Sequence, residues 1–305
     1  MAEGIEQPDW IAVDWGTTHL RAWAMTQDGT VLAEAQSDNG MGALSRDEFE
    51  PSLLDLVAPW LSPTPMTVVA CGMVGSRQGW VEAPYAATPC PPIAARMVSP
   101  ATTDPRLKVH VIPGVKQTEP PDVMRGEETQ IAGYLRLNPG FDGILCLPGT
   151  HTKWVRISEG QISAFRTSMT GEIFACLTQH SVLRHAVDTQ GWNDAAFAEA
   201  LGDAISRPEQ MATRLFSLRA DSLLNAMPPD IGTARLSGIL IGMELASVRG
   251  YWLGQEVTLI GASALAKVYD QALAAQGVQT RLTDAGTVTR AGLFAAYETM
   301  KETAT

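Results

Sequence analysis

A carboxylate and a glycine-threonine turn come directly after the first apolar strand that the sequence predicts. The strand covers residues 11–13, Asp14 follows it, and Gly16, Thr17 and Thr18 form a turn before the next strand begins. A tight turn of this kind can place several backbone N–H groups and two hydroxyls around a phosphate, beside a carboxylate able to hold a metal ion. The alternative is an ordinary β-hairpin whose turn contains glycine and threonine.

The same design returns near the middle of the chain. An apolar strand at residues 144–147 leads into Gly149, Thr150 and His151, and a second strand begins at once. In both places a third strand follows, entered through a further glycine. Two three-strand meanders, each with Gly-Thr at its first turn, indicate an internal structural duplication.

A third glycine turn comes late in the chain, where an apolar strand at 256–260 leads into Gly261, Ala262 and Ser263 at the start of a helix. A glycine after a strand is weak evidence alone, since it often stands there for steric reasons. Together the three turns suit a nucleoside triphosphate held between two domains. The first turn would face the γ-phosphate, the second the β- and γ-phosphates, and the third the adenosine.

The composition is that of a globular protein with two domains. The chain has 305 residues, of which 45% are apolar and 18% charged, and a domain usually holds about 100–200 residues. The formal net charge of −11 argues against a nucleic-acid or anionic membrane surface, because such surfaces need clustered Lys and Arg. It does not exclude a small anionic substrate, which needs only a few positioned cations.

The sequence predicts a soluble cytoplasmic protein. Its four cysteines are widely spaced and include no CxxC pair, so we expect reduced thiols and no zinc site. The first nine residues lack the basic start and apolar core of a secretory signal. No apolar run reaches the ~20 residues that are needed to cross a bilayer.

Strands that alternate with helices predict a mixed α/β fold. We expect an N-terminal domain at residues 1–121, with the first phosphate turn and the substrate site, and a C-terminal nucleotide domain at residues 122–305. The amphipathic stretch 288–301 is typical of a final helix. We expect this helix to pack back toward the first domain as a hinge element.

The order of these motifs resembles the actin, hexokinase and sugar-kinase superfamily, whose two related domains enclose ATP in a cleft. The turn after Asp14 looks like its first phosphate motif, residues 149–152 like its second, and residues 259–263 like its adenosine motif. The resemblance implies two RNase H-like domains with mixed sheets and an ATP cleft between them. The ATP-binding residues that it implies are Asp14, Gly16, Thr17, Thr18, Gly149, Thr150, His151, Gly261, Ala262 and Ser263.

Several longer strings are similar to a narrower family, the 2-dehydro-3-deoxygalactonokinases. They lie in register over nearly the whole chain, at residues 14–23, 72–85, 123–130, 148–154 and 165–172. This resemblance implies ATP-dependent phosphorylation of 2-dehydro-3-deoxy-D-galactonate at its 6-hydroxyl, a step of galactonate breakdown. The first alternative is a kinase of the same superfamily that acts on another sugar or sugar acid. The second and less favoured alternative is an ATP-driven binding or chaperone-like module.

Two carboxylates lie where the glycerol-kinase branch carries its catalytic base. The segment Arg125-Gly126-Glu127-Glu128 matches a Gly-Asp-Gln-Gln segment of that branch, so the resemblance gives Glu127 the position of the base, with Glu128 as the alternative. A carboxylate can orient the attacking hydroxyl and accept its proton as the bond forms. Asp14 is the candidate ligand of Mg²⁺, through a water molecule.

A substrate with a carboxylate calls for a cation that clamps it. The candidates are four basic side chains, the backbone N–H groups of residues 72–76, and Arg21 on the second strand of the phosphate hairpin. The candidate substrate-binding residues are therefore Arg21, Gly72, Met73, Val74, Gly75, Ser76, Arg77, Arg125, Lys153 and Arg166. A small-molecule sugar acid is the expected partner, and the sequence leaves open whether the chain forms a homodimer.

Overall fold

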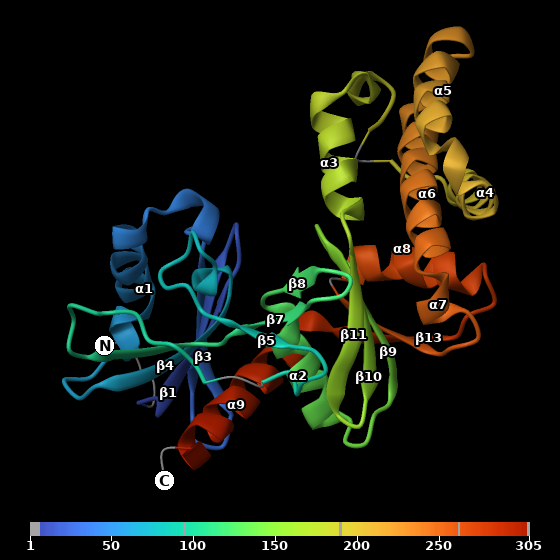
Figure 1. Cartoon of the computed structure of the whole chain (residues 1–305). Coiled ribbons are helices and arrows are strands. Elements are labelled where there is room, and N and C mark those ends of the chain that lie inside the picture. Colours follow the sequence, from blue (N-terminus) through green and yellow to red (C-terminus); the bar gives the residue numbers. More distant parts are fainter. Residues whose placement is uncertain (1–6, 94–95, 189–190, 262, 304–305) are drawn as a thin grey trace. The chain divides into compact units, whose positions relative to one another are not determined.

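The computed structural model describes residues 7–93, 96–188, 191–261 and 263–303. The chain divides into two compact units (Figure 1). The first unit holds Met1–Asp142, Ile157–Ala164 and Ala285–Thr305, and the second holds Gly143–Arg156 and Phe165–Asp284. The domain boundary expected near residue 121 stays a prediction.

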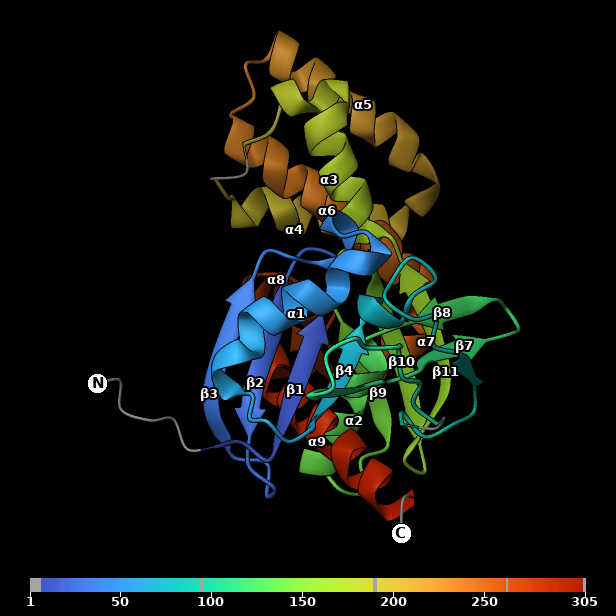
Figure 2. The same cartoon turned by 90° about the vertical axis from the view of Figure 1, so that its left-hand side faces the viewer.

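A five-stranded mixed sheet forms the core of the first unit (Figure 2). Its strands lie in the order β3-β2-β1-β4-β6. β1 (Trp10–Trp15), β2 (Leu20–Met25) and β3 (Val31–Ser37) are antiparallel neighbours, as the sequence predicts. β4 (Met66–Gly72) runs parallel to β1, and β6 (Leu107–Val111) runs parallel to β4.

Helices cover both faces of this sheet. Successive side chains of a strand point to opposite faces, and α1 (Phe49–Val57) packs against the face that carries Ile11 and Val13. The opposite face, with Trp10, packs against α9 (Ala285–Thr303). α9 therefore belongs to the first unit although it comes at the end of the chain.

α2 (Glu127–Leu137) crosses α9 at a contact of two glycines. A Cβ atom at Gly133 would lie 1.8 Å from the carbonyl oxygen of Val288, and one at Gly292 would lie 1.8 Å from that of Thr129. Only glycine allows such an approach, so the crossing holds the first turns of α2 in place. The small sheet that precedes α2 consists of β5 (Tyr85–Ala87), β7 (Gly114–Gln117) and β8 (Asp122–Met124).

The second five-stranded sheet repeats the strand order of the first. It runs β11-β10-β9-β12-β13, with β12 parallel to both of its neighbours. The internal duplication predicted from the two Gly-Thr turns is therefore confirmed. The strands are β9 (Gly143–Leu147), β10 (Thr152–Ser158), β11 (Gln161–Ser168), β12 (Val257–Gly261) and β13 (Thr280–Asp284).

Helices make up most of residues 170–252 (Figure 1). α4 and α6 pack closely because a glycine faces α4: a Cβ atom at Gly238 would lie 2.6 Å from the carbonyl oxygen of Phe197. Over the described residues, no helix is long and apolar enough to cross a membrane. The helices are α3 (Thr170–His180), α4 (Asp194–Ser206), α5 (Met211–Leu224), α6 (Pro229–Ser247), α7 (Arg249–Trp252) and, after β12, α8 (Ser263–Ala274).

Candidate active site

The first phosphate turn joins β1 to β2 and is held by the loop that follows β3. The N–H groups of Met41 and Gly42 donate to the carbonyl oxygens of Gly16 at 3.0 Å and Thr17 at 2.9 Å. Thr17 and Thr18 are exposed at the tip of the turn. The loop thus uses the carbonyl groups of the turn and leaves the threonine side chains at the surface, where they can meet a phosphate.

Asp14 lies near the end of β1, between β2 and β4. Its carboxylate accepts a hydrogen bond from the guanidinium of Arg21 and one, at 3.7 Å, from the thiol of Cys71. Gly72 comes next on β4 with φ of +92°, and a Cβ atom there would lie 2.6 Å from the carbonyl oxygen of Trp15. The structure therefore brings together Asp14, Arg21 and Gly72, three of the residues that the sequence singled out.

The glycine that precedes α2, Gly126, approaches Gly72 at the end of β4. Gly126 has φ of +101°, and a Cβ atom there would lie 3.3 Å from Cα of Gly72. Both carboxylate oxygens of Glu128 accept from the Gly126 N–H, at 2.9 and 2.7 Å. A hydrogen bond of 3.2 Å from the hydroxyl of Thr129 also reaches this carboxylate. Glu128 therefore ties the first turn of α2 to the glycine that contacts β4.

The environments of the two adjacent glutamates are opposite. Glu128 is fully buried, and the loss of hydration, followed by the charge of Glu127, raises the pKa of Glu128 to about 7. Glu127 is half-buried, and its carboxylate accepts from the N–H of Arg125 at 3.0 Å. Burial raises the pKa of the Cys71 thiol, and the charges of Asp14 and Glu128 raise it further.

The segment expected to offer backbone N–H groups to the substrate forms the end of β4 and a 3₁₀ turn (Met73–Gly75). Within it, Val74 and Gly75 are buried, and the N–H of Ser76 donates to the carbonyl oxygen of Met73 at 3.0 Å. The N–H group of Ser76, one of those predicted to bind the substrate anion, is thus already hydrogen-bonded within the turn. The side chain of Ser76 is buried as well.

The basic side chains predicted to bind the substrate carboxylate are divided between the two units. Arg125 lies beside Gly75, since a Cβ atom at Gly75 would be 2.8 Å from its Nη1. Arg77 turns away, with 80% of its side chain exposed and its Nε 3.6 Å from a carboxylate oxygen of Glu82. Lys153 is buried on β10 and Arg166 is half-buried on β11, both in the second unit.

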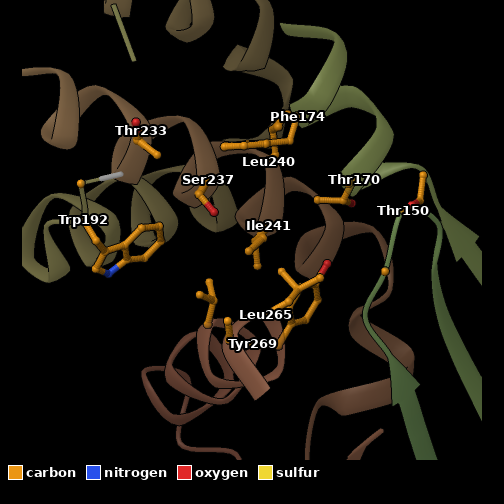
Figure 3. Close-up of a pocket in the computed structure, with 15 residues that line it drawn as sticks. Thr150, Thr170, Phe174, Trp192, Thr233, Ser237, Leu240, Ile241, Leu265 and Tyr269 are labelled. Atoms are coloured by element: carbon orange, nitrogen blue, oxygen red, sulfur yellow. The ribbon is translucent and has the colours of Figure 1, made fainter. Parts of the chain in front are cut away.

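The second unit contains a largely apolar cavity of about 600 Å³ (Figure 3), within the usual size range of small-molecule sites. The second Gly-Thr turn, with Gly149 and Thr150, lines one end of it. Figure 3 shows Trp192 at the far side, with Leu265 and Tyr269 rising from α8. Other side chains of the lining come from α3 and α6: Thr170, Phe174, Ser237, Leu240 and Ile241.

Three further residues that are predicted to bind the nucleotide lie within the described part of the chain, namely His151, Gly261 and Ser263. His151 is exposed and pairs through Nε2 with the carboxylate of Glu172 instead of lining the cavity. Gly261 ends β12, where a Cβ atom would lie 3.6 Å from the Pro148 ring. Ala262 lies outside the described residues, and Ser263 begins α8.

A buried carboxylate that the sequence analysis missed supports the wall of the cavity. Glu244 on α6 accepts hydrogen bonds from the indole of Trp154 at 2.8 Å, from the hydroxyl of Tyr269 at 2.8 Å and from the hydroxyl of Thr170. Burial raises its pKa, and the three donors oppose that effect. The available signal is a single acidic residue within the apolar stretch 236–248.

The model of the 2-keto-3-deoxy-galactonokinase family matches residues 14–296. The chain belongs to this family. A protein of Rhizobium meliloti (strain 1021) named "Probable 2-dehydro-3-deoxygalactonokinase DgoK1" is 39% identical, over 93% of this chain and 95% of that protein. The 2-dehydro-3-deoxygalactonokinase of Escherichia coli (strain K12) is 35% identical, over 93% of this chain and 96% of its own.

Solved structures agree with this membership. A crystal structure from Sinorhizobium meliloti, described as a candidate 2-dehydro-3-deoxygalactonokinase, has a TM-score of 0.88 at 38% identity, covering 95% of this chain and 96% of that one. Component A of the (R)-2-hydroxyglutaryl-CoA dehydratase of Acidaminococcus fermentans shares the fold alone, with a TM-score of 0.53 at 13% identity, covering 96% of this chain and 98% of that one.

Family and fold predictions from the sequence are thereby confirmed. The resemblance to the 2-dehydro-3-deoxygalactonokinases holds over the matched length. The predicted mixed α/β fold agrees with the two five-stranded sheets and with the fold shared with that dehydratase component. The prediction of a sugar-acid kinase is confirmed with them, while the roles of individual residues stay predictions.

Proposed function

We propose that the chain transfers the γ-phosphoryl group of ATP to the 6-hydroxyl of 2-dehydro-3-deoxy-D-galactonate, in the cytoplasm and with Mg²⁺. The observation that carries this proposal is the close approach of Gly126 to Gly72, where a Cβ atom added to Gly126 would lie 3.3 Å from Cα of Gly72. It joins the N-terminus of α2, which carries both glutamates, to the end of β4, where the thiol of Cys71 donates to Asp14. Phosphoryl transfer needs positioned charges and a group that accepts the proton of the hydroxyl.

Asp14 is the residue that we assign to the metal ion. Mg²⁺ is commonly held by one or two carboxylates, while phosphate oxygens and water complete its shell. The described residues contain no cluster of three His, Cys, Asp or Glu side chains that could hold a metal ion by themselves, and a single half-buried carboxylate fits the Mg²⁺ pattern. When bound, the ion neutralises charge on the transferred phosphoryl group. Arg21, paired with Asp14, adds a fixed positive charge.

Glu127 is the carboxylate that we assign as the general base. Its side chain is half-buried and can therefore meet a substrate hydroxyl, whereas Glu128 is fully buried with both oxygens on the Gly126 N–H. A general base must come within hydrogen-bond reach of the proton that it accepts. Glu128 then has a different task, which is to hold the glycine turn from which Glu127 projects.

The cavity of the second unit is the site that we assign to the nucleoside of ATP. Its lining is mostly apolar, with a few hydroxyl groups, which suits a flat base and a ribose. The phosphates would lie toward Gly149 and Thr150, and the base toward Trp192, whose ring can stack on it.

A coupled ADP-release assay with a panel of 2-keto-3-deoxy sugar acids tests the reaction and the base together. We expect turnover with the galactonate-derived acid, and a loss of about 10²–10⁴-fold in kcat for Glu127→Gln. Glu34→Gln changes an exposed glutamate on β3 of the same unit and is the matched control. Turnover restricted to other acids would refute the substrate assignment, and near-normal kcat in Glu127→Gln would refute the base.

A further inference from the structure

Two residues beside Gly75 in the first unit, Ser76 and Arg125, carry buried polar atoms without a hydrogen-bond partner among the described residues. Over the residues that the structure describes, four buried side-chain nitrogen or oxygen atoms lack a hydrogen-bond partner, and three of them belong to Ser76 and Arg125. They are Ser76 Oγ and the Nε and Nη1 atoms of Arg125; the fourth belongs to Arg214 in the second unit. The whole side chain of Ser76 is buried, with a residue exposure of 6%.

The guanidinium of Arg125 is held in a shaped cradle. Its Nη2 donates to the carbonyl oxygen of Ala83 at 2.7 Å, and its Cζ lies 4.4 Å from the centre of the Tyr85 ring. Two glycines make the room: a Cβ atom at Gly75 would lie 2.8 Å from Nη1, and one at Gly114 would lie 2.8 Å from the Tyr85 ring. One face and one nitrogen are therefore fixed, while the other two nitrogens have unused N–H groups.

Leaving these buried donors without an acceptor would lower the stability of the folded protein. A buried donor with no acceptor loses the hydrogen bonds that water gave it, and the loss is larger when the donor is charged. An anion placed against the guanidinium and the serine hydroxyl would satisfy all three atoms with charge-assisted hydrogen bonds. The place is also near the chemistry, because the N–H of Arg125 itself binds the carboxylate of Glu127 at 3.0 Å.

We propose that Arg125 and Ser76 bind the carboxylate of the sugar-acid substrate, and that Tyr85 is a positioning residue that holds the guanidinium for this contact. The inference rests on the proposed function and selects one of the basic residues that the sequence left as alternatives. The donor atoms are shielded from solvent, so substrate entry requires a local opening at this place. Arg77, two residues from Gly75, is exposed and pairs with Glu82, so it takes no part.

The proposal is tested by how strongly the enzyme prefers the charged acid over an uncharged analogue of it. Kinetics by coupled ADP release would compare the galactonate-derived acid with its neutral carboxamide, in the wild type and in Arg125→Met. We expect KM for the acid to rise about 10- to 100-fold in Arg125→Met, as for the loss of a charge-assisted hydrogen bond. The preference for acid over carboxamide should then nearly vanish, while KM for ATP stays within about twofold.

Three further variants separate binding from folding. Ser76→Ala removes a hydroxyl that has no partner among the described residues, so it should fold normally and raise KM for the acid about 3- to 10-fold. Tyr85→Leu should raise this KM as well, and Tyr85→Phe, which keeps the ring, should restore it. Lys108→Met, at an exposed position of β6, is the matched control, with kinetics within about twofold of the wild type.

Two outcomes would overturn the carboxylate site. One is an Arg125→Met variant that still prefers the acid over the carboxamide as strongly as the wild type does. The other is an Arg125→Met protein that does not fold, together with a Ser76→Ala variant of unchanged KM, which would leave an internal water as the partner of these atoms. Calorimetric titration of the wild type and Ser76→Ala with the acid reports binding without turnover. Binding that weakens in Ser76→Ala, in a protein that releases no ADP, would therefore support the carboxylate site and refute the proposed reaction.

Discussion

The two units share a sheet order but bury different kinds of polar groups. In the first unit, the buried or half-buried groups around the glycine contacts are charged, namely Asp14 with Arg21, the buried Glu128, and Arg125. In the second unit, the buried carboxylate of Glu244 is surrounded by the neutral donors of an indole and two hydroxyls.

A single pair of equivalent positions shows how the copies diverged. Asp14 stands two residues before Gly16, and Leu147 stands two residues before Gly149. Asp14 is half-buried beside Arg21, whereas Leu147 is buried and apolar. Both copies of the fold thus have the Gly-Thr turn, but only the first has a carboxylate two residues before its glycine. The difference suits a division of labour between handling charge and binding a neutral nucleoside.

Asp14→Asn would make the first turn nearly as uncharged as the second, and it carries the largest expected effect. We expect kcat to fall about 10²–10³-fold, since charge stabilisation by a bound metal ion is worth several kcal/mol, and the Mg²⁺ concentration for half-maximal activity to rise. Asp55→Asn, at an exposed position of α1, is the control. Unchanged Mg²⁺ dependence of the remaining activity would show that Asp14 does not serve the metal ion.

Glu128→Gln tests whether the buried charge of the first unit weakens the fold at neutral pH. The pKa of Glu128 is raised from 4.5 to about 7, so the folded protein holds a proton there that the unfolded chain releases. Stability from this group is present below pH 4.5 and is lost as the pH rises through 7. Between pH 5 and 8 the wild type should lose about 2–3 kcal/mol relative to Glu128→Gln.

Urea unfolding of both proteins at a series of pH values measures this difference. The comparison between the two proteins cancels the other groups that titrate in the same range. A difference that stays constant from pH 5 to 8 would mean that Glu128 keeps an ordinary pKa, and the contrast between the two units would then lose its main support.

Much of this arrangement could be predicted because it depends on short stretches of sequence. An apolar run followed by a glycine turn predicts β1, its turn and their near-copy around Gly149, and the resemblance to the glycerol-kinase branch singled out both glutamates. Which glutamate is buried could not be predicted. It depends on the approach of Gly126 to Gly72, residues 54 positions apart, and on the crossing of α2 by α9 at the end of the chain.

The role of Glu244 could not be predicted for the same reason. Its donors come from β10, α3 and α8, at separations of 90, 74 and 25 residues along the chain. The apolar stretch around Glu244 marks it as unusual, but local sequence does not tell which donors it binds. The position of the Arg125 guanidinium likewise depends on Ala83 and Tyr85. These two residues and Arg125 lie in different strings of the family resemblance, at 72–85 and 123–130, and the sequence does not show that they are in contact.

Glu244→Gln carries the smallest expected effect and tests the second unit. The amide keeps one acceptor oxygen, so one of the three donors from Trp154, Thr170 and Tyr269 must find another partner. Thr170 and Tyr269 line the nucleoside cavity, and a lost hydrogen bond of about 1 kcal/mol should raise KM for ATP about fivefold. Because the charges of the first unit are untouched, kcat and KM for the sugar acid should stay within about twofold. A fall in kcat with an unchanged KM for ATP would instead give Glu244 a part in the chemical step, and the division between a charged unit and a neutral one would fail.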